Sequence, residues 1–315
     1  MELVKNNVYL RNKAGQAANK MYVNEEVNVS EVFPEIYNIV REKTEIQLDK
    51  VTPETDQVIL NGYINYNILY YTNDSDMVYG IEGEIPFEET LRIGNTDENS
   101  IVDVKMEVDS SNVKLYNSRK FALRAEILIS AVSEGLESIE FPDKMENSRG
   151  MEVLNDTVET MSVVAEQTEN IRIKESVYIP GVKPAADRIV WKELKLKNVT
   201  SRVNDGMINV SGEMYMFIMY LPEEADMPNQ WIETTVDFKD NLEMSEATED
   251  LISFINVTLQ DGKIHLNENE EGENRELSID AVLQLEIKLY KENKTEILMD
   301  IYSPTKNVQT KLKDV

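Results

Sequence analysis

Apolar and polar residues alternate with a period of two along most of the chain. This pattern is typical of β-strands that bury one face, because successive side chains of a strand point to opposite sides. The polar residues Asn65 and Asn67 alternate with one such apolar row and lie on the opposite face of the strand. The rows that we expect to be buried hold Ile64, Tyr66, Ile68, Tyr70; Met214, Met216, Ile218, Tyr220; Val102, Val104, Met106, Val108; Ile255, Val257, Leu259; Phe121, Leu123, Ala125, Ile127, Ile129; and Ile279, Ala281, Leu283, Leu285, Ile287, Leu289.

A single apolar face per strand favours antiparallel sheets over parallel sheets that are covered on both sides. Turn-forming residues separate the strands at 73–76, at Asp205-Gly206 and at Asp261-Gly262. The two Asp-Gly pairs suit tight hairpins. Several short strands in each half of the chain therefore predict an all-β protein with antiparallel β-sandwiches.

Helix signals are scarce. Pro34 and Pro184 each stand where a first helical turn can begin, so we predict one short helix at residues 34–40 and one at 184–190. A longer helix at 151–166 is an alternative to a strand there. The matching segment of the first half contains Gly15 and several Asn residues, which are weak helix formers.

The two halves of the chain repeat each other. Shifting the sequence by 150 positions superimposes residues along the whole stretch from 2 to 70, and the offset then grows as later loops gain residues. A period of this length indicates two duplicated domains rather than a solenoid of short units. The matched pairs include Glu2 and Glu152, Val27 and Val177, Pro34 and Pro184, Ile39 and Ile189, Gly62 and Gly212, Ile68 and Ile218, Tyr70 and Tyr220, Phe87 and Phe238, and Phe121 and Ile279.

The duplication sets the expected domain limits. We expect a first β domain at 1–140, a linker at 141–150 and a second β domain at 151–315. The segment 141–150 is polar and carries Pro142 and Gly150, which is typical of a linker.

Composition narrows the classes of partner. The chain has 315 residues and a formal net charge of −27, so it repels phosphate backbones and anionic lipid headgroups. We therefore expect neither nucleic acid nor direct membrane insertion. The absence of cysteine excludes disulfides and thiol catalysis and fits a reducing compartment. The first residues show no signal-peptide pattern.

No familiar catalytic arrangement is present, and we expect no enzyme, no cofactor and no catalytic, cofactor-binding or metal-binding residue. His265 is the single histidine and fits a strand position. A lone histidine without cysteine cannot form a typical zinc site. Acidic pairs such as Asp74 with Asp76, Asp97 with Glu98 and Glu270 with Glu271 are read as solvated loops, with structural calcium as the alternative.

The positions of the aromatic residues allow two interpretations. Trp191 and Trp231 pack in a core or at its rim, or they form an exposed platform for sugar stacking. The strand with Tyr63, Tyr66, Tyr70 and Tyr71 places tyrosines on both faces, so some hydroxyl groups must reach water or a partner.

Several short segments resemble the SPOCS domain family. They are residues 27–40, the related stretch 179–193, the central strand Gly62–Tyr71, residues 84–89 and 117–121, and Tyr302-Ser-Pro-Thr-Lys. Together they cover most of 25–130 and 175–306. The arrangement is similar to the N-terminal part of SipL-like clostridial proteins. In these proteins a LysM module usually follows, and this module is associated with the coat-ATPase contact. No LysM-like segment follows Tyr302 here, and we read the chain as a truncated form or a short paralogue.

The resemblance implies a non-enzymatic, protein-binding scaffold of spore coat assembly, in the mother-cell cytoplasm around the forespore or in the coat itself. Spore coat morphogenetic proteins are the implied partners, and self-association is a further option. The alternative function is a carbohydrate-binding or adhesin-like β-sandwich. That alternative predicts an exposed aromatic platform at Trp191 or Trp231.

Overall fold

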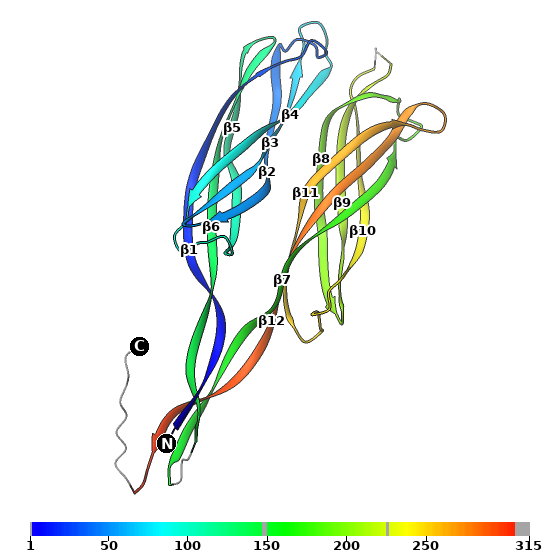
Figure 1. Cartoon of the computed structure of the whole chain (residues 1–315). Coiled ribbons are helices and arrows are strands. Elements are labelled where there is room, and N and C mark those ends of the chain that lie inside the picture. Colours follow the sequence, from blue (N-terminus) through cyan, green and yellow to red (C-terminus); the bar gives the residue numbers. More distant parts are fainter. Residues whose placement is uncertain (1, 147–149, 225–226, 306–315) are drawn as a thin grey trace.

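The chain forms two β-sandwiches that stand side by side, each continued by a long twisted ribbon of two strands (Figure 1). This computed structural model describes residues 2–146, 150–224 and 227–305. The described residues contain twelve strands, all paired antiparallel, and no helix. The prediction of an all-β protein with antiparallel sandwiches is confirmed.

The first sandwich packs two three-stranded sheets face to face. One sheet has the order β1-β6-β5 and the other has the order β2-β3-β4. The strands are β1 (Glu2–Asn28), β2 (Asn38–Glu54), β3 (Gln57–Tyr71), β4 (Val78–Arg92), β5 (Ile101–Asn117) and β6 (Lys120–Glu146).

The second sandwich repeats this architecture. Its sheets have the orders β7-β12-β11 and β8-β9-β10, so each strand has the same neighbours as its counterpart in the first half. The strands are β7 (Glu152–Tyr178), β8 (Ala186–Asn204), β9 (Met207–Pro222), β10 (Gln230–Glu243), β11 (Ile252–Glu268) and β12 (Asn274–Tyr302).

The predicted apolar rows build the two cores. Ile64 and Ile68 of β3 are fully buried between the sheets, and so are Met214 and Ile218 of β9. The facing sheets contribute alternate residues of β6 and β12, including Ile127 and Leu285. The alternation in the sequence therefore identified the inner faces of the central strands correctly.

The predicted short helices are wrong. Residues 34–37 and 184–185 form loops, and β2 and β8 begin directly after them. The loop backbone is bonded to distant groups instead of to its own next turn: the Tyr70 hydroxyl donates to the Pro34 carbonyl at 3.0 Å, and the Tyr220 hydroxyl donates to the Pro184 carbonyl at 3.1 Å. Burial raises the pKa of Tyr70 to about 12, which keeps this donor protonated.

The alternative of a helix at 151–166 is also wrong. This stretch lies in β7, whose backbone pairs with β12 residue by residue from Glu152 to Tyr178. Residues 141–146 of the expected linker lie in a strand, because β6 continues to Glu146. Pro142 is tolerated there because it pairs with Lys5 beside a β-bulge, where a missing amide proton costs little. Residues 147–149 lie outside the described residues.

Only one of the two Asp-Gly pairs forms the turn that the sequence predicts. Asp205-Gly206 forms the predicted tight turn between β8 and β9, and Gly206 has a φ of 78°, which favours glycine. Asp261-Gly262 does not form a hairpin, because it lies inside β11 at a β-bulge. A Cβ at Gly262 would stand 2.8 Å from Leu194 Cδ1, so this glycine allows β11 to pack closely on β8.

The outer parts of the longest strands form the two ribbons. In the first ribbon, residues 2–12 of β1 pair with 135–146 of β6, and in the second ribbon, residues 152–162 of β7 pair with 291–302 of β12. No third strand runs alongside them in these parts of the described chain. Both ribbons leave the same end of the two sandwiches (Figure 1).

Candidate functional site

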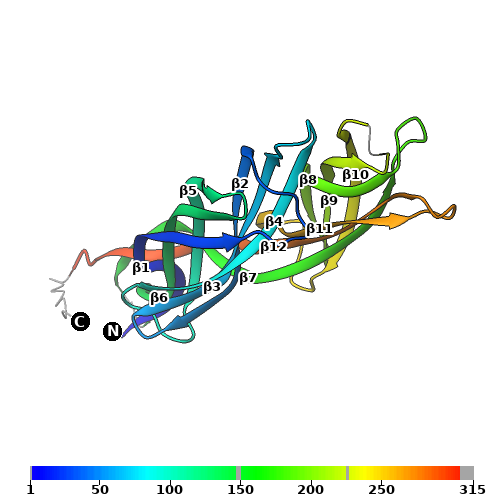
Figure 2. The same ribbon diagram turned by 90° about the horizontal axis from the view of Figure 1, so that it is seen from above.

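The two sandwiches contact each other near their loop ends and near the start of the ribbons, and a cleft lies between them. The view from above shows β4 of the first sandwich beside β8 of the second (Figure 2). The cleft has a volume of about 700 Å³. The outer face of the sheet β2-β3-β4 forms one wall, and the edge strands β8 and β11 form the other.

The first contact is an apolar group near the loop ends of the sandwiches, which we call the tip cluster. Leu69, Val190, Trp191 and Leu221 are buried in it. Gly80 makes this close approach possible, because a Cβ there would lie 1.9 Å from the carbonyl oxygen of Val190. Apolar burial therefore holds the sandwiches together at this end.

Polar bonds surround the tip cluster. The side chain of Asn229 accepts from the Val78 amide at 2.8 Å and donates to the Val78 carbonyl at 2.9 Å, which satisfies one residue of edge strand β4. The Trp191 indole donates to Glu193 at 3.1 Å, and the Arg41 guanidinium lies 4.8 Å above the Trp191 ring. Hydrogen bonds from the side chains of Lys195 and Trp191 hold the pKa of Glu193 below its ordinary value, although partial burial opposes this shift.

The second contact lies near the start of the ribbons. Lys288 of β12 reaches Glu134 of β6 at 3.4 Å and Glu166 of β7 at 3.3 Å. Burial works to lower the pKa of Lys288, but the two carboxylates together raise it above the ordinary value. Lys288 therefore stays charged, and its ion pair with Glu134 joins the two halves of the chain.

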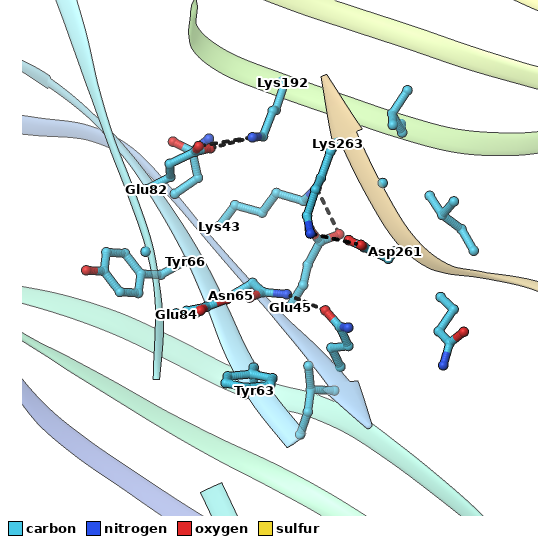
Figure 3. Close-up of a pocket in the computed structure, with 18 residues that line it drawn as sticks. Lys43, Glu45, Tyr63, Asn65, Tyr66, Glu82, Glu84, Lys192, Asp261 and Lys263 are labelled. Atoms are coloured by element: carbon cyan, nitrogen blue, oxygen red, sulfur yellow. Dashed lines mark hydrogen bonds and ion pairs between the residues drawn. The ribbon is translucent and has the colours of Figure 1, made fainter. Parts of the chain in front are cut away.

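The walls of the cleft are polar, and their charges are largely paired (Figure 3). Lys192 of β8 bridges the cleft to Glu82 of β4 at 2.8 Å. Two further pairs join residues of one strand: Lys43 with Glu45 at 2.8 Å, and Lys263 with Asp261 at 3.3 Å.

Neutral polar side chains occupy the centre of the first wall. Asn65 of β3 donates to Gln47 of β2 at 3.2 Å. Tyr63, Asn65 and Asn67 follow one another on the outer face of β3, because alternate residues of a strand share a face. Asn65 and Asn67 are the polar residues that alternate with the buried row in the sequence.

The two tryptophans differ completely. Trp191 is 1% exposed and belongs to the tip cluster, so the core reading is correct for it and the platform reading is wrong. Trp231 is 51% exposed, as the platform reading requires. One face of Trp231 stacks on Phe217, with ring centroids 6.4 Å apart, and the Lys183 ammonium lies 5.2 Å from the Trp231 centroid.

The remaining predicted positions do not gather into a site. His265 is exposed on β11, opposite Ser278 of β12, in the strand position that the sequence predicts. Within the ranges that the structure describes, no group of three or more His, Cys, Asp or Glu residues is arranged to hold a metal ion. The same residues include no helix that is long and apolar enough to cross a membrane.

Sequence reasoning missed the cleft, although it named several residues of its walls. Tyr63 and Asn65 were assigned to the correct strand, and Asp261 and Gly262 were expected in a turn. The polar face of β3 was a usable signal, because asparagine is depleted from strands. No pattern indicated that β8 and β11 would face it.

The same architecture occurs in both halves, and the comparison with known protein families identifies it. Residues 35–116 and 185–267 match the family described as SipL, SPOCS domain. The chain belongs to the SPOCS domain family. The two matched regions span just over half of the chain and run from the loop before β2 to β5, and from the loop before β8 to β11. No curated protein and no solved structure matches the chain.

The resemblance noted in the sequence is therefore confirmed, over a narrower part of each half. The ribbons and the final segment at Tyr302 lie outside the matched SPOCS regions. The SPOCS family is not a known family of enzymes, and membership is consistent with a protein related to sporulation and the spore coat.

Proposed function

We propose that this SPOCS protein is a non-enzymatic scaffold that binds other proteins during spore coat assembly. Its place of action is the mother-cell cytoplasm around the forespore and the coat that forms there. Family membership supports the link to the coat. The observation that carries the scaffold role is the second ribbon, which presents apolar side chains and open strand edges beyond the sandwich.

The ribbons are suited to protein binding for a physical reason. An isolated pair of strands is at best marginally stable in water, and its unpaired backbone groups readily accept another strand. Eleven residues of β7 extend about 35 Å at the usual rise of a strand. Exposed apolar residues line the second ribbon: Val153, Leu154, Val158, Met161, Met299 and Tyr302.

Coat morphogenetic proteins, together with further copies of this chain, are the partners that we propose. Strand addition along a ribbon edge uses main-chain bonds for affinity and apolar side chains for specificity. The net charge of −27 makes nucleic acid an unfavourable partner and disfavours insertion into an anionic membrane.

The scaffold role is tested by capture from sporulating cells with two matched double variants. Leu154→Glu with Met161→Glu places charges on the exposed side chains of the second ribbon. Val32→Glu with Val182→Glu makes the same change at the exposed loop ends of the two sandwiches. We expect the native chain and the loop variant to recover coat proteins, as identified by mass spectrometry.

The ribbon variant should recover few or none of them while keeping the far-UV circular dichroism of the native chain. If the ribbon variant recovers the same coat proteins as the loop variant, the ribbons are not the binding surface. If the native chain recovers no coat protein, the scaffold role itself is wrong.

A further inference from the structure

The cleft between the sandwiches has the chemistry of a ligand site, and its charges indicate the class of ligand. Three ion pairs within its walls neutralise Lys43, Lys192 and Lys263. An anionic ligand would have to compete with the carboxylates that pair with these lysines. The cleft therefore disfavours a ligand with a net negative charge.

Hydrogen-bonding groups on the wall formed by β3 and β4 lack partners. The Oδ1 atom of Asn67 is buried and has no hydrogen-bond partner among the described residues, so a ligand reaches it only when the side chain turns toward the cleft. Among the described residues, Glu84 forms no ion pair, and no side chain is hydrogen-bonded to its carboxylate. An unpaired buried acceptor costs free energy, so a ligand that donates hydrogen bonds would stabilise this wall.

Tyr63 supplies a flat apolar surface in the same wall. Its ring lines the cleft next to the Asn65 row and makes no stacking contact with another described aromatic ring (Figure 3). A tyrosine ring offers a large, rigid contact area at low entropic cost. Planar rings beside amide and carboxylate side chains are suited to ligands that have apolar faces and hydroxyl edges.

The duplicated half shows that the fold itself does not require this set of residues. The positions that match Tyr63, Asn65 and Asn67 hold Glu213, Tyr215 and Phe217. Lys197 stands 3.8 Å from the centroid of the Tyr215 ring and covers it. The amide row is therefore a property of the wall that faces the cleft and not of the sandwich.

We propose that the cleft binds a neutral oligosaccharide of several sugar units, with one ring stacked on Tyr63 and hydroxyl groups bonded to Asn65, Asn67 and Glu84. The volume of about 700 Å³ lies within the range of small-molecule sites. This proposal does not depend on the scaffold role. It also moves the sugar-binding surface from the tryptophans, where the sequence suggested it, to Tyr63.

An extended peptide is the less favoured occupant. Peptides bind in clefts through apolar pockets or through a free strand edge. The edge of β11 is closed at Gly262 by contact with Leu194 of β8, and the pocket walls are polar.

The experiment titrates the purified full chain by isothermal calorimetry. The neutral probes are the pentasaccharides of β-1,4-glucose, α-1,4-glucose and N-acetylglucosamine, and the charged probe is penta-galacturonic acid. We expect at least one neutral probe to bind and the charged probe to bind more weakly. Tyr63→Ala should weaken that binding by about tenfold, which corresponds to about 1.4 kcal/mol of lost stacking.

Tyr215→Ala is the matched control, because it removes the tyrosine from the outer face of the second sandwich without touching the cleft. It should change the affinity by less than about twofold. Both variants should keep the native melting temperature within a few degrees. The proposal is overturned if no neutral probe binds at about 10 mM, a concentration that detects even millimolar affinities. It is equally overturned if Tyr63→Ala binds as tightly as Tyr215→Ala.

Discussion

Val40 and Val190 occupy the same position in the two duplicated halves, yet Val40 is 48% exposed and Val190 is 3% exposed. The same contrast separates Tyr71, which is exposed, from its counterpart Leu221, which is buried. The strands, their order and the turn positions agree between the halves. The difference arises because the buried members contact the other sandwich in the tip cluster.

This comparison shows which parts of the duplicated domain are constrained by folding. Inside each sandwich, the matched residues Ile68 and Ile218 are both fully buried. Each sandwich also has the hydrogen bond from a tyrosine hydroxyl to a proline carbonyl. On the outside, Arg41 in one half corresponds to Trp191 in the other, and the two lie against each other. The cores retained their chemistry, whereas the outer faces diverged to form a contact and a cleft.

The largest effect is expected from removing residues 2–22. This deletion takes away most of β1 and with it Met21 of the first core, and it leaves one edge of β6 largely unpaired while β5 stays on the other. We expect the first sandwich to lose its cooperative unfolding transition in urea, while the second keeps its own. Deletion of 2–12 alone removes only one strand of the first ribbon and should leave both transitions in place. An unchanged melting temperature and oligomer size after deletion of 2–22 would contradict this prediction.

Replacing each tryptophan by alanine should lower the free energy of unfolding much more at the buried position than at the exposed one. Trp191→Ala removes a ring that is buried between the sandwiches, and it should cost about 3–5 kcal/mol of unfolding free energy. Trp231→Ala should cost less than about 1 kcal/mol, because half of that side chain already contacts water. Urea titration followed by circular dichroism measures both values. Equal losses would show that the tip cluster does not contribute specifically.

Gly80→Ala tests the contact between the sandwiches without altering a core. The added Cβ would collide with the Val190 carbonyl, and overpacking of this kind typically costs about 1–3 kcal/mol. We expect the sandwiches to separate at the tip cluster and the radius of gyration in small-angle X-ray scattering to rise. Gly94→Ala is the matched control, since nothing lies within 4 Å of the Cβ position there. A radius unchanged by Gly80→Ala would mean that the tip cluster does not fix the spacing.

The smallest effect on stability is expected from lowering the pH. The bonds that Glu193 accepts lower its folded-state pKa, so this carboxylate stabilises the contact above its ordinary pKa of 4.5 and loses that contribution as pH falls through the lowered value. Glu193→Gln should therefore be slightly less stable than the native chain at pH 7 and equally stable at pH 2. Thermal melts at both pH values provide the measurement. A difference that persists at pH 2 would assign the effect to packing rather than to charge.

Much of the fold was predictable because its causes are local or repeated. The period-two rows at Ile64–Tyr70 and Met214–Tyr220 identified both cores, and Asp205-Gly206 identified a turn. The helices predicted at Pro34 and Pro184 do not form, because the loop carbonyls accept hydrogen bonds from Tyr70 and Tyr220, which lie 36 residues further along the chain. The hairpin predicted at Asp261-Gly262 does not form either, because close packing on Leu194 needs a glycine where no turn exists.

The sequence by itself determined the strands, their buried faces and the duplication, because side-chain alternation and repetition can be read along the chain without knowing what lies opposite. Only the tertiary structure decided that Trp191 is buried, that Trp231 is exposed and that Tyr63 lines a cleft. These properties depend on how two sandwiches rest against each other. That placement is set by contacts between residues about 150 positions apart, such as Val78 with Asn229 and Lys288 with Glu134.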